Sequence, residues 1–141
     1  MGAFSDTPAL IAKGTILPFT FVKADSSNDD AGLQSTANTD TILGVTDGST
    51  KAFNSGNHAE TGDPITLQGG GVVLITCNSS PGTINPGTML EAASDGTCKA
   101  ATVTVGPARR FHGYAALQAG AAGRVIRARL VGGFIYYPTT L

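Results

Sequence analysis

Turn-forming residues recur along this chain and leave only short apolar segments between them. Asp47-Gly48, Pro81-Gly82, Pro86-Gly87 and Asp95-Gly96 each favour a tight turn, and Gly69-Gly70-Gly71 adds another. Glycine makes up 19 of the 141 residues, which is nearly double its usual share of about 7%. Short strands with turns about every eight to twelve residues are typical of a β-sandwich or a small β-barrel. The sequence therefore predicts an all-β protein, and its length fits one domain.

The apolar segments between the turns predict the strands. We expect strands at 16–22, 42–46, 64–68, 72–77, 89–92, 99–105, 111–117, 124–131 and 134–137. The three glycines at 69–71 predict a hairpin that joins the strand at 64–68 to the strand at 72–77. In the first strand, period-two spacing places Leu17, Phe19 and Phe21 on one face. The segments 24–40 and 49–61 are polar, and we expect both to be exposed loops.

The first thirteen residues differ from the rest of the chain. They contain Phe4, Leu10 and Ile11 without a regular period, and Pro8 disfavours a helix through the middle. We expect residues 1–13 to form an extended N-terminal arm that lies on its own domain or on a neighbouring molecule, and residues 14–141 to form the single β domain. An arm cannot bury its own apolar side chains, so these three residues are candidates for a protein interface.

Charged residues are few and unevenly distributed. They make up 13% of the chain, about half the usual 25%, which indicates either a surface partly covered by neighbours or a neutral, hydrated one. Residues 1–95 carry all ten acids and three lysines, a net charge of −7, and residues 96–141 carry six bases and no acid, +6. This asymmetry favours an acidic partner or self-association of unlike faces. The alternative is that the two halves lie side by side within one domain and neutralise each other's charge.

Four arginines of the basic half are the strongest candidates for binding. In the strand at 124–131, Arg127 and Arg129 alternate with Ile126, Ala128 and Leu130, so the two kinds of side chain are expected on opposite faces. Arg109 and Arg110 extend the basic set. A pI near 6.0, an aromatic content of 6% and the absence of Trp argue against a nucleic-acid surface. We therefore predict a protein interface, where arginine is favoured for its planar, multidentate geometry.

The residues that could carry catalysis do not form a recognisable motif. His58 lies in a polar loop beside Glu60, and His112 lies near basic residues at an expected sheet edge; no serine stands in a nucleophile elbow. Turn chemistry accounts for Asp47, Asp63 and Asp95 without a catalytic role. The sequence predicts a protein that is not an enzyme and has no catalytic residues.

Metal and cofactor motifs are also missing from the sequence. The acidic segment 25–30 lacks the spacing and terminal glutamate of an EF-hand, and Cys77 and Cys98 lack the paired spacing of a zinc site. Whether these two cysteines pair stays open. We expect no cofactor and no metal. The chain has no secretory signal, and none of its apolar runs is long enough to span a membrane. We therefore expect a soluble protein made in the cytoplasm, with no membrane partner.

A series of short motifs resembles the capsid decoration, or cement, proteins of tailed bacteriophages over about residues 14–131. The motifs are Phe21-Val22, Ile-Leu-Gly-Val at 42–45, Gly-Asp-Pro-Ile at 62–65 before a glycine-rich turn, Pro-Gly-Thr-Met-Leu at 86–90, Asp95-Gly96, Gly-Tyr-Ala-Ala-Leu at 113–117, and Arg-Val-Ile-Arg-Ala-Arg-Leu at 124–130. The longer polar loops at 24–40 and 49–61 depart from that pattern and leave any contact with a host surface open.

The resemblance implies a fold, a location and partners. Members of that family are β-barrel or β-sandwich modules on the outside of the capsid. They commonly form trimers, bind the major capsid protein and bridge neighbouring capsomers against internal pressure, and they have no catalytic residues. The implied function is therefore a structural virion protein. The alternative is a carbohydrate-binding β module on a virion or cell surface, whose aromatic platform would have to come from Tyr114, Tyr136 and Tyr137.

Overall fold

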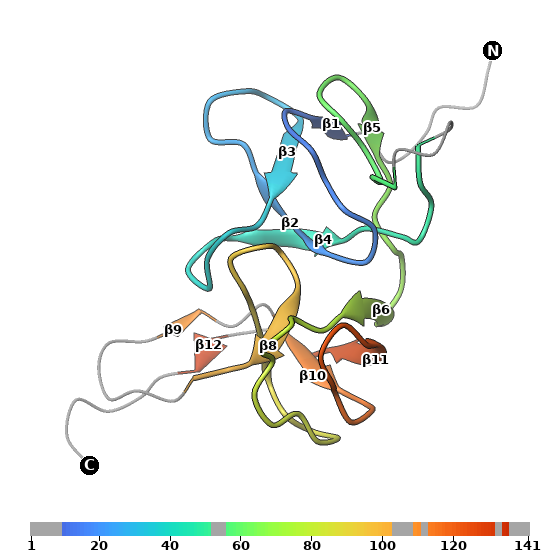
Figure 1. The fold of residues 1–141 in the computed structure, drawn as a ribbon. Helices are drawn as coiled ribbons and strands as arrows, with labels where there is room; N and C mark the ends of the chain where they lie inside the picture. The colour runs from blue at the N-terminus through green and yellow to red at the C-terminus, as the bar shows by residue number, and fades with distance from the viewer. Residues whose placement is uncertain (1–9, 52–55, 103–108, 111–112, 132–133, 136–141) are drawn as a thin grey trace.

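The protein is all-β, as predicted, and the described part of the chain contains no helix. A computed structural model describes residues 10–51, 56–102, 109–110, 113–131 and 134–135. A five-stranded sheet, with strand order β4-β2-β3-β1-β5, comes from residues 10–65, and three smaller sheets come from residues 72–135. Figure 1 shows the five-stranded sheet at one end of the molecule and the smaller sheets at the other.

The five-stranded sheet contains both parallel and antiparallel strand pairs. Its strands are β1 (Leu10–Ala12), β2 (Phe21–Ala24), β3 (Ala31–Gln34), β4 (Ile42–Val45) and β5 (Pro64–Ile65). β1 is parallel to β3 and antiparallel to β5, and it therefore lies inside the sheet. β2 pairs with β3 on one side and with β4 on the other, antiparallel to both.

The C-terminal strands form a three-stranded sheet and two two-stranded sheets. The three-stranded sheet has the order β10-β11-β6, from β10 (Tyr114–Ala116), β11 (Val125–Leu130) and β6 (Val72–Thr76). β7 (Leu90–Ala92) pairs with β8 (Cys98–Ala100) through the Asp95-Gly96 turn, as predicted. β9 (Arg109–Arg110) pairs with β12 (Phe134–Ile135).

Two hydrophobic clusters lie on opposite sides of β2. Phe21 and Val22 are adjacent in sequence and both are fully buried, because successive side chains of a strand point to opposite faces. Phe21 packs with the C-terminal strands, in a cluster that includes Ile75, Leu90 and Ile126. On the other side of β2, Val22 packs in a smaller cluster whose other buried members are Ala12, Ile16, Ala59 and Ile65. The first sheet is thus covered on both faces, and the larger cluster joins the two ends of the molecule.

The predicted arm is not separate from the sheet over its last residues. Leu10–Ala12 form β1, and the side chain of Ala12 is fully buried. The backbone of Ile11 donates to Asp30 O at 2.9 Å, and that of Ala12 donates to Asp63 O at 2.8 Å. The expected boundary at residue 13 therefore falls just after an interior strand of the domain. Phe4 and the rest of residues 1–9 lie outside the described residues.

Three further expectations differ from the structure. The strand expected at 16–22 is β2 and begins only at Phe21, because Pro18 and Phe19 form a turn in which Phe19 has a φ of 53°. Leu17 is consequently 38% exposed and does not share the buried face of Phe21. The segment 24–40 is not one loop, because Ala31–Gln34 form β3 and close a hairpin with β2.

The predicted hairpin around Gly69-Gly70-Gly71 is also wrong. β5 pairs with β1 in the five-stranded sheet, whereas β6 pairs with β11 in the three-stranded sheet. The three glycines therefore connect two sheets rather than two neighbouring strands. Each strand finds a ladder partner from a distant part of the chain, which local turn chemistry does not reveal.

Candidate protein-binding surface

One side of the three-stranded sheet is buried and the other is exposed. Along β11, Ile126 and Ala128 are fully buried, while Val125, Arg127 and Arg129 are exposed. The predicted placement of Arg127 and Arg129 on the opposite face from Ile126 and Ala128 is confirmed. Leu130 is the exception, because it is 48% exposed at the end of the strand although the pattern places it with the buried residues.

Strand pairing surrounds the two arginines with apolar side chains. Arg127 lies opposite Leu74 and Arg129 lies opposite Val72 on β6, and these two partners are 39% and 42% exposed. On the other side, Leu117 donates its backbone N–H to Arg127 O at 2.9 Å and is itself 41% exposed. Directly opposed residues of an antiparallel pair share a face. We define the β11 face as Val72, Leu74, Leu117, Val125, Arg127 and Arg129.

The backbone of β11 is hydrogen-bonded on both sides. β11 is the middle strand, with hydrogen-bonded neighbours on both sides. Beyond the end of β10, the side-chain Oε1 of Gln118 accepts a hydrogen bond from the backbone N–H of Arg127 at 2.8 Å. The exposed side chains are therefore presented by a rigid support, which lowers the entropy lost when a partner binds.

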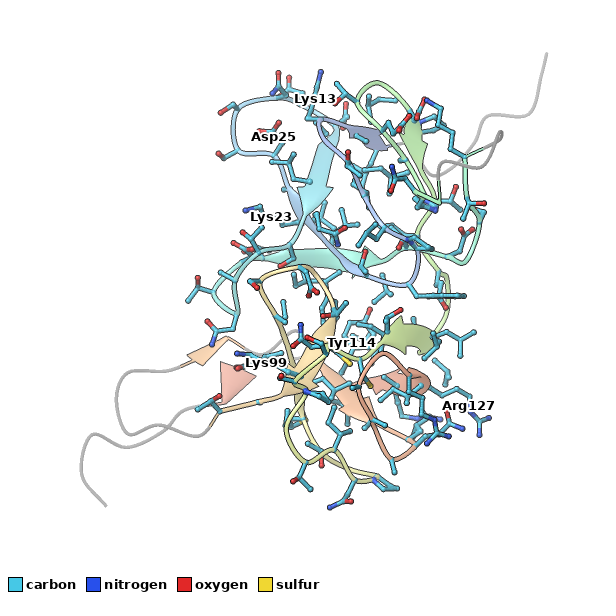
Figure 2. All side chains as sticks on the ribbon, in the orientation of Figure 1. Lys13, Lys23, Asp25, Lys99, Tyr114 and Arg127 are labelled. Carbon is cyan, nitrogen blue, oxygen red and sulfur yellow. The ribbon has the colours of Figure 1, made fainter. Side chains whose placement is uncertain are left out.

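The β11 face is cationic and carries no acid. None of β6, β10 and β11 contains an Asp or Glu, and within the described residues neither Arg127 nor Arg129 forms an ion pair. The lysines at 23, 51 and 99, in contrast, are each paired with a carboxylate of the same chain. Figure 2 shows Arg127 extending away from the ribbon at the end of the molecule opposite Lys13 and Asp25.

This arrangement can bind a surface that is both apolar and acidic. Arginines with apolar neighbours are a composition enriched at protein interfaces, and a guanidinium group can bind a carboxylate through two parallel hydrogen bonds. A second copy of the same face is a poor partner, because two-fold pairing would bring arginines close to arginines.

Comparison with known proteins shows which solved structure has a similar fold. No family model matches the chain, and no curated protein matches it. Among solved structures, the fold is similar to the head fiber gp8.5 N base of bacteriophage phi29. The TM-score is 0.61 and the identity is 14%, and the match covers 86% of this chain and 90% of that chain. Nearly the whole chain thus shares the architecture of a phage head fiber base.

The structure does not bring all the predicted interface residues together. Arg109 and Arg110 form β9, which belongs to the two-stranded sheet with β12 and not to the sheet of Arg127; their side chains lie outside the described part of the structure. Leu10 and Ile11 are half-buried in β1 between β3 and β5. These two residues therefore contribute to the fold.

None of the four apolar residues of the β11 face was among the predicted interface residues; these four are Val72, Leu74, Leu117 and Val125. Val72 and Leu74 belong to a segment in which four successive residues are apolar, Val72-Val73-Leu74-Ile75. Because all four residues are apolar, the sequence does not indicate whether Val72 and Leu74 or Val73 and Ile75 point outward. Only its pairing with β11 determines that Val73 and Ile75 are buried and that the other two are exposed.

His58 is a buried structural residue and not the exposed loop histidine that the sequence indicated. Its side chain is only 2% exposed. Nδ1 lies 2.9 Å from the carbonyl oxygen of Ser49, and Nε2 accepts the backbone N–H of Thr66 at 3.0 Å. The two ring nitrogens of His58 thus link the backbone of Ser49 to the backbone of Thr66. His112 lies outside the described residues.

The acidic segment at 25–30 forms a turn. Asp25 accepts hydrogen bonds from the backbone N–H of Ser27 and from the side chain of Asn28, both at 2.9 Å. These two bonds hold the pKa of Asp25 below its usual value. Among the described residues, no group of three or more His, Cys, Asp or Glu side chains could hold a metal ion. The described part of the chain also has no helix that is long and apolar enough to cross a membrane.

The described residues do not form an aromatic platform for a sugar. Tyr114 is 7% exposed, and its ring centroid lies 5.8 Å from that of Phe21; burial raises its pKa. Tyr136 and Tyr137 lie outside the described residues. An open hollow of about 350 Å³ near β2 has no aromatic residue in its lining, which is Lys23, Ala24, Ser26, Leu33, Asp40 and Thr41.

Proposed function

We propose that this protein is a structural component of a bacteriophage virion that binds the outside of the capsid and stabilises it. The observation that carries the proposal is the similarity of nearly the whole chain to the base of a phage head fiber. The sequence motifs that resemble capsid decoration proteins support the same conclusion independently of the fold. The proposed role is non-enzymatic, with the outer capsid surface as its location.

The β11 face is the proposed contact with the major capsid protein. Arg127 and Arg129 have no acidic partner among the described residues, so acidic side chains of a capsid surface can pair with them without breaking an internal ion pair. Val72, Leu74, Leu117 and Val125 supply the apolar area around them. Burial of the apolar side chains stabilises the contact, while the arginines determine which surface is bound.

Several copies acting together would account for reinforcement of a shell. We propose that the protein is a homo-oligomer, with a trimer favoured over a dimer, and that it bridges neighbouring capsomers. Linking three weak contacts raises the effective affinity by orders of magnitude without any new type of contact. This arrangement suits a protein that must occupy many identical positions on one particle.

A binding experiment with capsid shells tests the proposal. Light scattering gives the mass of the free protein, and co-sedimentation measures its occupancy on empty shells of the corresponding phage. We expect a stable oligomer that co-sediments with the shells, and we expect Arg127→Glu to weaken the binding at least about tenfold. A monomer that stays in the supernatant with every shell would contradict the proposal, and binding on a glycan array would then favour the carbohydrate-binding alternative.

The matched control is Lys13→Glu. Lys13 is exposed and carries the same charge, and it lies at the opposite end of the molecule from Arg127 (Figure 2). The control therefore changes the net charge by the same amount without changing the β11 face. Equal loss of binding in both variants would indicate a general charge effect and would remove the β11 face from consideration.

A further inference from the structure

Two cysteines that are distant in sequence lie in contact inside the C-terminal half. Cys77 follows β6 and Cys98 begins β8, and both are free thiols. Their Sγ atoms are 4.0 Å apart, and the residues are 1% and 0% exposed. Both side chains belong to the larger hydrophobic cluster.

The backbones of the two cysteines are already in the position that a disulfide requires. Cys77 and Cys98 are partners in an isolated parallel β-bridge, and the next residue, Asn78, donates its backbone N–H to Cys98 O at 2.8 Å. Strands joined in this way lie about 4.8 Å apart, which falls within the Cα separation of about 4.4–6.8 Å found in disulfides. The sulfur atoms have to approach from 4.0 Å to the S–S bond length of about 2.05 Å.

We propose that Cys77 and Cys98 are a redox pair, which stays as two thiols in a reducing compartment and closes to an intramolecular disulfide in an oxidising one. The co-reactant is a small-molecule disulfide such as oxidised glutathione. The thiolate of one cysteine attacks it and releases one thiol. The second cysteine then loses its proton and displaces the second small thiol from the mixed disulfide. Two S–H bonds are lost from the protein, one S–S bond forms, and the oxidant is reduced to two thiols.

Burial makes this closure slow while the protein stays folded. Loss of solvent around Cys98 raises the pKa of its thiol, and the neighbouring Cys77 raises it further, so little reactive thiolate is present. Gly120 covers the other sulfur, since a Cβ at Gly120 would lie 3.2 Å from Cys77 Sγ. Exchange therefore requires the 117–124 turn to open, or takes place during folding, before the turn has closed.

The disulfide would join two sheets that the fold otherwise connects by packing and hydrogen bonds. β6 belongs to the β10-β11-β6 sheet and β8 to the β7-β8 pair, and the cross-link would close a loop between positions 21 apart in sequence. Resting on the proposed function, a particle that leaves a reducing host cytoplasm for an oxidising medium would carry subunits able to acquire this cross-link.

Refolding in defined redox buffers tests the proposal directly. The whole chain is unfolded in urea and refolded in a glutathione buffer that is either oxidising or reducing, and the free thiols are then counted under denaturing conditions. In the oxidising buffer we expect both thiols to disappear, the intact mass to fall by two hydrogen atoms, and the melting temperature to rise by roughly 5–15 °C over the reduced form. Native protein in the same buffer should reach the same end state more slowly.

Single-serine variants provide the controls and the contrary outcomes. Cys77→Ser and Cys98→Ser should each retain one free thiol or one glutathione adduct and should show no rise in melting temperature. Persistence of two free thiols after oxidative refolding of the unchanged chain would overturn the proposal, and so would glutathione adducts or cross-linked dimers in place of the internal disulfide. None of these outcomes depends on capsid binding, so failure here and failure of the proposed function are separate results.

Discussion

The side-chain amide of Gln68 pairs with the backbone of Leu74 in the way that a neighbouring strand would. Its Nε2 donates to Leu74 O at 2.7 Å, and its Oε1 accepts from Leu74 N at 2.8 Å. The same Nε2 also donates to Thr46 O at 2.9 Å. One side chain therefore satisfies backbone groups on the free edge of β6 and ties that edge to the residue that follows β4.

Replacing Gln68 should loosen the connection between the two sheets. Gln68→Ala leaves three backbone groups without their partner, and we expect the free energy of unfolding to fall by about 2 kcal/mol in urea titrations. Gln118→Ala is the control, because among the described residues that side chain forms one hydrogen bond, from Arg127 N, so we expect a loss of about 1 kcal/mol. Equal losses in the two variants would contradict the role assigned to Gln68.

A methyl group at Gly120 should disturb the packing that covers Cys77. A Cβ there would lie 2.8 Å from Ile84 Cβ and 2.9 Å from Ile84 Cδ1, distances that force either the turn or the Ile84 side chain to move. We expect Gly120→Ala to lower the free energy of unfolding by about 1–3 kcal/mol. Gly69→Ala is the control because no atom lies within 4 Å of its added Cβ, and we expect it to be neutral or slightly stabilising. A stable Gly120→Ala variant would show that the turn accommodates the methyl group.

Asp40 holds the segment that follows β3 through several hydrogen bonds. Its Oδ2 accepts from Ser35 Oγ and from the backbone N–H groups of Thr36 and Ala37, each at 3.0 Å, and lies 3.7 Å from Lys23 Nζ. Partial burial raises the pKa of Asp40, but these interactions together outweigh it, and the pKa lies below its ordinary value of 3.8. The ionised form therefore stabilises the folded state.

Acidification should remove this contribution. Because the folded-state pKa of Asp40 is lowered, its stabilisation is complete above the unfolded pKa and is lost as the pH falls through the folded value. We expect Asp40→Asn to cost about 1 kcal/mol near pH 7 in urea unfolding, and to cost progressively less below about pH 4. Asp29→Asn, at an exposed site with no ion pair among the described residues, is the control. A cost for Asp40→Asn that is independent of pH would argue against an ionic origin.

Two N-terminal deletions should show that the fold depends on β1 and not on residues 1–9. Removing residues 1–12 takes away β1, including the fully buried Ala12, and leaves β3 and β5 without the strand between them. We expect this variant to be insoluble or to lose most of its cooperative unfolding transition. Removing residues 1–9 keeps β1, and we expect a cooperative transition like that of the whole chain. A stable fold after the longer deletion would show that β1 is dispensable.

The sequence was most informative where polar and apolar residues alternate. In β11, the alternation of Ile126 and Ala128 with Arg127 and Arg129 identified both the strand and its exposed side. The Asp95-Gly96 turn likewise identified the β7-β8 pair. In both cases the decisive information is local, because strand periodicity and turn geometry depend on residues close together in the chain.

The sequence failed where distant residues decide the structure. β3 was missed because Ala31-Gly32-Leu33-Gln34 has one large apolar side chain. A Cβ at Gly32 would lie 2.7 Å from Ile65 Cδ1 and 3.0 Å from Val22 Cγ1, so the glycine lets these two side chains pack close to β3. The pairing of β6 with β11, and with it the outward direction of Val72, also depends on a segment far along the chain. Local propensity does not encode such long-range pairings.

The position of β1 between β3 and β5 has a consequence for how the protein is made. Leu10 is synthesised early, but its partner Ile65 follows only after β2, β3 and β4. A ribosome releases the chain in order, so the first strand must wait with one edge unpaired until β5 has emerged. Pairing of strands so far apart in sequence also slows folding. The nascent protein therefore passes through a stage at which an open strand edge is available to other chains, and rapid translation through residues 13–65 would shorten that exposure.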